Sequence, residues 1–132
     1  MNNFIFENAT KAVFGQGCVK EYLSCMVSHY GPNVLLAYGG GSIKRNGIYD
    51  EVCGILQSTD KNIVEFSGIM PNPTYAKVQE GAKLVRGNHI DLILAVGGGS
   101  VMDCCKAVSM AARYDGDLWA DYWARPGVVD FE

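Results

Sequence analysis

The stretch at residues 92–106 constrains the fold more than any other, and it reads Leu-Ile-Leu-Ala-Val-Gly-Gly-Gly-Ser-Val-Met-Asp-Cys-Cys-Lys. Its leading apolar run is typical of a strand buried on both faces, as in a parallel sheet. Gly97, Gly98 and Gly99 lack a Cβ, so their backbone can adopt positive φ and approach a ligand closely. We expect Ser100 to cap a following helix, whose free N–H groups and positive dipole end suit an anion. The stretch therefore predicts a site for a nucleotide phosphate, with a purely structural turn as the alternative.

Strand-like and helix-like patterns alternate along the rest of the chain. Apolar runs predict buried strands at residues 33–38, 62–66 and 91–96, and helical spacing predicts helices at about 19–27, 48–56, 78–85 and 100–112. Short apolar runs at residues 4–6 and 12–14, joined by a polar link, predict an N-terminal β-hairpin. Counting the hairpin, strand and helix alternate four times. We therefore predict an α/β fold, a Rossmann-like parallel sheet with helices on both faces and a hairpin at the N-terminus.

Composition excludes several classes of partner. The 132 residues fit one domain, and a net charge of −3 without a basic stripe argues against nucleic acid. We expect no membrane association, because no apolar run approaches bilayer length and no signal peptide is visible. Five cysteines, an odd number without a CxxC pair, predict a reduced, cytoplasmic compartment.

The last segment differs from the rest. We expect the α/β domain to occupy residues 1–113, and residues 114–132 to begin the connection to a further domain. This segment is rich in Trp, Tyr and Asp without a clear period, and Trp119, Tyr122 and Trp123 predict a surface that packs against a neighbour. No terminating element precedes Glu132, so we expect the sequence to be truncated at this point.

A second glycine loop follows the predicted strand at residues 33–38. Gly40, Gly41 and Ser42 lie in it, and Lys44 and Arg45 come directly after. In dinucleotide sites an acid after a strand selects the free ribose hydroxyls, whereas cations suit a 2′-phosphate. The loop is therefore predicted to hold an adenosine ribose and to prefer NADP(H) over NAD(H), unless the two cations are merely solvated.

Two further polar residues are candidates for contact with a cofactor. Asp103 is expected in the first turn of its helix, where it either complements the dipole or accepts a hydrogen bond from a sugar hydroxyl or a cofactor amide. Asn72 stands between two prolines, and its amide either reads a cofactor group or closes a simple Asx-turn. His29 and His89 have no partner at ligand spacing, so we assign no metal ligand. No set of nucleophile, base and orienting residue is apparent, so we assign no catalytic residue.

At these motifs the chain resembles a known family. Residues 97–106 are similar to the cofactor motif of the iron-containing (group III) alcohol dehydrogenases. Residues 38–50 and 68–74 resemble the butanol-dehydrogenase-like branch of that family, which includes NADPH-dependent aldehyde reductases, and residues 4–17 also fit.

The resemblance to this family implies a domain organisation and cofactor contacts that the spacing of the motifs alone does not. It implies a dehydroquinate synthase-like N-terminal domain, followed in the family by a helical domain that binds Fe²⁺, Zn²⁺ or another divalent metal through one Asp and three His. That helical domain is missing here. The resemblance places the pyrophosphate at Gly97, Gly98, Gly99 and Ser100, the adenosine ribose and its 2′-phosphate at Gly40, Gly41 and Ser42, and cofactor contacts at Asn72 and Asp103. It also suggests a homodimer formed through the opening hairpin.

We therefore predict the cofactor-binding half of an NADP(H)- and metal-dependent alcohol dehydrogenase or aldehyde reductase. Such an enzyme transfers hydride between the nicotinamide and a small alcohol or aldehyde, and this chain alone is expected to be inactive. One alternative is a non-catalytic nucleotide-binding or interaction module that ends at residue 132. Another is a related metal-dependent sugar-phosphate synthase, against which the Pro-Asn-Pro loop argues.

Overall fold

A three-stranded parallel sheet organises residues 8–124, the part of the chain that the computed structural model describes. The strands are β1 (Asn33–Tyr38), β2 (Asn62–Phe66) and β3 (Leu92–Val96), in the spatial order β2-β1-β3. The helices are α1 (Cys18–Ser28), α2 (Ser42–Arg45), α3 (Ile48–Ser58), α4 (Tyr75–Gly87) and α5 (Gly99–Arg113), followed by a π-helical turn, η1 (Trp119–Trp123). The predicted α/β class and parallel sheet are confirmed.

The central strand β1 lies at the centre of the core because helices cover it on both faces of the sheet. Residues 34–37 of β1 are fully buried, as a continuous apolar run in a parallel sheet requires. Its alternate side chains enter two separate hydrophobic layers. One layer packs β1 and β2 against α4 and α5 through Leu35, Ala37, Phe66, Val78, Ala82, Val101 and Val108. The other packs β1 against α1, α2 and α3 through Val27, Val34, Leu36, Tyr38, Ile43, Val52 and Leu56.

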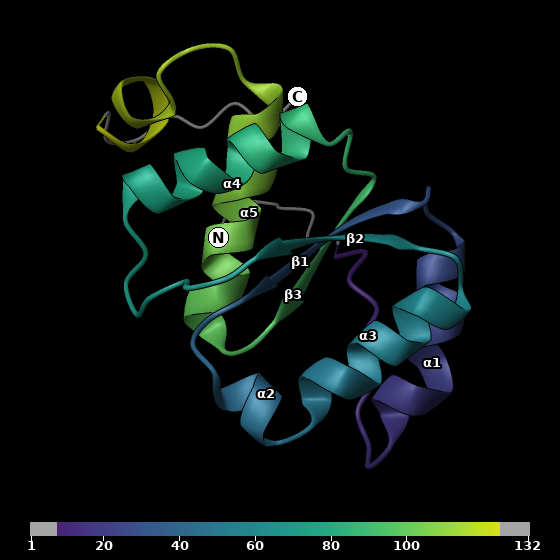
Figure 1. Ribbon diagram of the computed structural model, residues 1–132. Coiled ribbons are helices and arrows are strands. Elements are labelled where there is room, and N and C mark those ends of the chain that lie inside the picture. The colour runs from purple at the N-terminus through teal and green to yellow at the C-terminus, as the bar shows by residue number, and fades with distance from the viewer. Residues whose placement is uncertain (1–7, 125–132) are drawn as a thin grey trace, which may run out of the picture.

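Figure 1 shows this layering, with α4 and α5 on one side of the sheet and α1, α2 and α3 on the other. Residues 114–124 fold back onto the α4–α5 layer, where Leu118 is buried. The ring of Tyr75 lies 6.0 Å from that of Trp119 and 6.0 Å from that of Trp123. The aromatic segment therefore packs on its own domain, although both tryptophans stay about half exposed.

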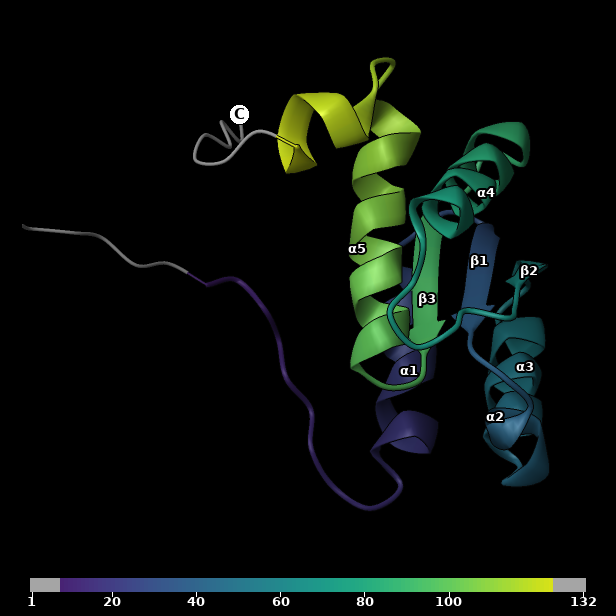
Figure 2. The same ribbon diagram turned by 90° about the vertical axis from the view of Figure 1, so that its left-hand side faces the viewer.

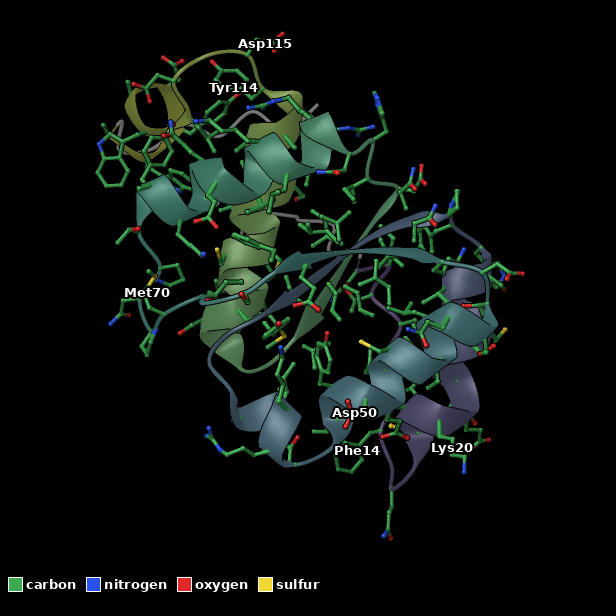
Figure 3. The ribbon with its side chains drawn as sticks, viewed as in Figure 1. Phe14, Lys20, Asp50, Met70, Tyr114 and Asp115 are labelled. Atoms are coloured by element: carbon green, nitrogen blue, oxygen red, sulfur yellow. The ribbon has the colours of Figure 1, made fainter. Side chains whose placement is uncertain are left out.

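The predicted N-terminal hairpin is not formed by its described arm. Residues 12–14 belong to no strand, and the side chain of Phe14 is fully exposed (Figure 3). Residues 4–6 lie outside the described part of the chain. A strand exists only where a neighbouring strand supplies the ladder, and an isolated two-stranded hairpin is marginal in water. An apolar run of three residues was therefore not enough to form a strand at residues 12–14. Within residues 8–124, strand and helix alternate three times rather than four.

Among residues 8–124, no helix is both long enough and apolar enough to cross a bilayer. The five cysteines are all free.

Candidate nucleotide-binding site

The two glycine loops meet at one edge of the sheet and then separate. Tyr38, the last residue of β1, is the register partner of Val96, the last residue of β3. The first loop leads to α2, where Ile43 packs in the α1–α3 layer, and the second leads to α5, where Val101 packs in the α4–α5 layer. The chain thus leaves two adjacent strands toward opposite faces (Figure 2). Ligands of open α/β sheets bind at such a point, beyond the carboxyl ends of the strands.

The N-terminus of α5 is open. Its N-cap residue, Gly98, has extended backbone (φ −85°, ψ −169°), and no side chain accepts a hydrogen bond from the first turn. The Gly98 carbonyl accepts from the N–H groups of Val101 (3.1 Å) and Met102 (3.2 Å). The N–H groups of Gly99 and Ser100 precede these and have no intrahelical acceptor, by the geometry of an α-helix. The predicted capping role of Ser100 was wrong, because the N-cap is Gly98, two residues earlier, and Ser100 lies inside the first turn.

The glycines of this loop serve two purposes. A Cβ on Gly97 would lie 2.7 Å from Cγ2 of Val101, so a side chain there would prevent α5 from closing onto the sheet. A Cβ on Gly98 or Gly99 would meet nothing within 4 Å. No residue of the loop has positive φ, so the expected left-handed backbone is not needed here. What glycine provides at Gly98 and Gly99 is free space in front of the helix end.

The first glycine loop is fixed by the loop that follows β2. The N–H of Gly68 donates to the Gly39 carbonyl (3.0 Å), and that of Ile69 donates to the Tyr38 carbonyl (3.3 Å). A Cβ on Gly39 would lie 3.1 Å from the Ile69 carbonyl oxygen, so the two loops touch through their backbones. Gly40, Gly41 and Ser42 remain exposed beyond this contact. The structure therefore presents the predicted ribose loop at the surface.

Asn72 lies further along the loop after β2, which Figure 3 shows at the carboxyl end of that strand, where Met70 is labelled. Its φ is 52°, a left-handed conformation that asparagine tolerates better than most residues. The side chain is exposed and makes no hydrogen bond within residues 8–124, so the alternative of an Asx-turn is not what the structure contains. Thr74 then caps α4 by accepting from the N–H of Lys77 (3.3 Å).

Asp103 was expected in the first turn of α5. It lies in the second turn, because the helix begins at Gly99. The dipole effect fades beyond the first turn, so it does not explain this acid. Its side chain is 73% exposed and lies 3.4 Å from the Lys106 ammonium, an exposed pair that contributes about 0–1 kcal/mol. Asp103 also borders a groove of about 400 Å³ that Pro73, Tyr75, Val78, Cys104, Ala107, Trp119 and Trp123 complete.

A cluster of side chains that sequence patterns did not reveal adjoins the first glycine loop. The hydroxyl of Tyr38 donates to Oε2 of Glu65 at 2.5 Å, and that of Tyr49 donates to Oε1 of the same carboxylate. The Lys44 ammonium lies over both rings, 5.3 Å from the centroid of Tyr38 and 4.5 Å from that of Tyr49. Lys44 is therefore not merely solvated, which was the alternative. The one signal in the sequence is an acid in an otherwise apolar strand, Ile-Val-Glu-Phe.

The two buried thiols of α5 are not activated. Burial raises the pKa of Cys104, and it raises the pKa of Cys105 to about 12, so both thiols stay protonated at neutral pH. Within the described residues, no group of three or more His, Cys, Asp and Glu side chains could hold a metal ion.

Comparison with known proteins agrees with this architecture. A family model described as iron-containing alcohol dehydrogenase matches residues 9–130. Over 119 residues the chain is 53% identical to "Probable NADH-dependent butanol dehydrogenase 2" of Bacillus subtilis (strain 168), covering 90% of this chain and 30% of that protein. It is 41% identical over 123 residues to the NADPH-dependent aldehyde reductase YqhD of Escherichia coli (strain K12), covering 93% and 30%.

A solved structure shares the fold as well. The crystal structure of NADH-dependent butanol dehydrogenase A from Thermotoga maritima superposes with a TM-score of 0.83 at 42% identity, covering 92% of this chain and 31% of that one. The chain thus spans about a third of the length of the relatives it matches. The resemblance seen in the sequence motifs is confirmed, and the chain belongs to the iron-containing alcohol dehydrogenase family.

Proposed function

We propose that this chain is the dinucleotide-binding part of an NADP(H)-dependent alcohol dehydrogenase or aldehyde reductase that acts on small alcohols or aldehydes. One observation carries the proposal: the N-terminus of α5 is uncapped and faces open space at Gly98 and Gly99, beside a second exposed glycine loop at the same edge of the sheet. Anions bind helix ends of this kind because free N–H groups and the dipole act together.

Each candidate residue has a role in this arrangement. The N–H groups of Gly98, Gly99 and Ser100 would hold the diphosphate, and Gly97 would keep α5 close to the sheet. Gly40, Gly41 and Ser42 would receive the adenosine ribose. Asp103 and Asn72, both exposed and at the same end of the sheet, would contact the rest of the cofactor. The nicotinamide, when bound, supplies the hydride chemistry.

The metal of the family does not fit the described residues, since no cluster among them could hold it. We propose that it is held by a further domain, and that the chain alone does not turn over substrate. The division at residue 113, a homodimer and a cytoplasmic location also stay predictions.

The preference for NADP(H) is supported by cations at the first loop. Lys44 stands on its two aromatic rings, and the Arg45 guanidinium lies 3.2 Å from the position a Cβ would take on Gly41. Of the three relatives named above, two are described as NADH-dependent and one as NADPH-dependent, so the preference has to be measured for this chain.

Calorimetric titration of the chain with NADPH and with NADH tests the proposal. We expect weak binding that saturates only at millimolar ligand, because an open half-site buries less of the ligand than a closed pocket does. NADPH should bind about tenfold tighter than NADH, which corresponds to about 1.4 kcal/mol. Nicotinamide riboside, which lacks the diphosphate, serves as the control and should give no heat. Absence of heat with both dinucleotides, for a chain that is folded by circular dichroism, would contradict the proposal, and equal affinities would remove the preference.

A further inference from the structure

One carboxylate ties together the elements around the first glycine loop. Glu65 comes from β2, Tyr38 from the end of β1 and Tyr49 from the first turn of α3. The two tyrosine hydroxyls donate to different oxygens of Glu65, so the carboxylate is held at both ends. The Tyr38 and Tyr49 rings meet edge to face at 5.7 Å, with an angle of 69° between their planes. We call Tyr38, Tyr49 and Glu65 the Glu65 platform.

The platform holds Lys44, the third residue of α2. Its ammonium lies within 6 Å of both ring centroids, the range of a cation–π contact. Each phenol donates its proton toward a carboxylate, and such polarisation makes the rings better partners for a cation. Lys44 itself is exposed, so its ammonium is positioned by the rings without being buried. A ligand can therefore reach it from the solvent.

The charges of this group are stable near neutral pH. The hydrogen bond from Tyr38, then that from Tyr49, and the charge of Lys44 all lower the pKa of Glu65. Tyr38, and to a smaller degree the charge of Glu65, raise the pKa of Lys44. The lysine is thus a fixed cation and the glutamate a fixed anion.

The Glu65 platform lies beside the first glycine loop, which indicates a role in ligand binding in addition to packing. Tyr38 immediately precedes Gly39, and Lys44 follows Ser42 by two residues, so the fixed cation stands at the loop to which we assign the adenosine ribose. Glu65 is exposed, and exposed polar contacts of this kind add little to stability. We propose that Glu65 is a positioning residue that holds Lys44, through Tyr38 and Tyr49, where it receives the ribose 2′-phosphate and so sets the cofactor preference. This inference rests on the proposed function.

Two small ligands separate this role from general binding. 2′,5′-ADP carries the additional phosphate and 5′-AMP does not, and both can be titrated into the chain by calorimetry. Glu65→Gln removes the charge but keeps an oxygen acceptor, so we expect about three- to fivefold weaker binding of 2′,5′-ADP. The affinity for 5′-AMP should stay within about twofold. Tyr49→Phe, which removes only a hydroxyl, should act in the same direction. Glu51→Gln on α3 is the matched control, since it changes the net charge equally and should leave both affinities unchanged.

A double-mutant cycle supplies the decisive readout. If Glu65 acts through Lys44, then Glu65→Gln should have no further effect on 2′,5′-ADP binding in a Lys44→Gln background. Tighter binding of 2′,5′-ADP by Glu65→Gln, or an undiminished loss in the double variant, would overturn the inference while leaving the proposed function intact. A folded wild-type chain that binds neither ligand would overturn both.

Discussion

The substitution Gly81→Val should destabilise the chain by about 3 kcal/mol, because it forces side-chain volume into the closest contact between α4, α5 and the sheet. A Cβ on Gly81 would lie 2.6 Å from Cγ2 of Val108 and 2.9 Å from Cε1 of Phe66. Both neighbours are fully buried, so neither can move aside into solvent. The free energy of unfolding from urea titration, followed by circular dichroism, measures the loss.

Gly54→Val provides the control. Gly54 also lies inside a helix, α3, but it is exposed and a Cβ there would meet nothing within 4 Å. Glycine and valine differ little in helix propensity, so the unfolding free energy should change by less than about 0.5 kcal/mol. Equal losses from the two substitutions would show that close approach of α4 to its neighbours is not what Gly81 provides.

The substitution Gly98→Asp should stabilise the fold and abolish dinucleotide binding. Gly98 is the N-cap of α5, its backbone is extended, and its Cβ would stand in open space, so aspartate fits without strain. Aspartate would accept the free N–H groups of the first turn and complement the dipole, adding about 0.5–1 kcal/mol to stability. The same carboxylate would occupy and repel the place of the diphosphate, so NADPH affinity should fall about 100-fold, or about 2.7 kcal/mol. Urea unfolding and calorimetry measure the two opposite effects.

Gly98→Asn separates capping from charge. Asparagine caps a helix about as well as aspartate but carries no charge, so it should stabilise the chain similarly and weaken NADPH binding by less. If both variants bound NADPH as well as the wild-type chain does, the end of α5 would not be where the anion lies.

Much of the fold was predictable from sequence because its strands are largely apolar runs, and the central strand β1 is buried on both faces. The strands predicted at residues 33–38 and 62–66 have those same bounds in the structure, and β3 begins one residue later than predicted. Continuous apolar runs between turn residues leave few other interpretations. The coming together of the two glycine loops also followed, since parallel strands end at one edge of a sheet.

The differences between the predictions and the structure have several physical causes, some local and some dependent on contacts distant in sequence. Residues 12–14 form no strand, and a helix of four residues such as α2 is too short to show a period. The start of α5 was misjudged because glycine, not serine, occupies its N-cap. The Glu65 platform joins residues 27 and 16 positions apart, so no local motif could reveal it.

The most direct test of the account is an NMR titration of the ¹⁵N-labelled chain with NADPH. If the diphosphate binds at the end of α5, the largest amide shifts should occur at Gly98, Gly99 and Ser100, with a second set at Gly40, Gly41 and Ser42. A folded spectrum in which these amides stay still, while shifts gather instead at the groove beside Trp119 and Trp123, would contradict the account.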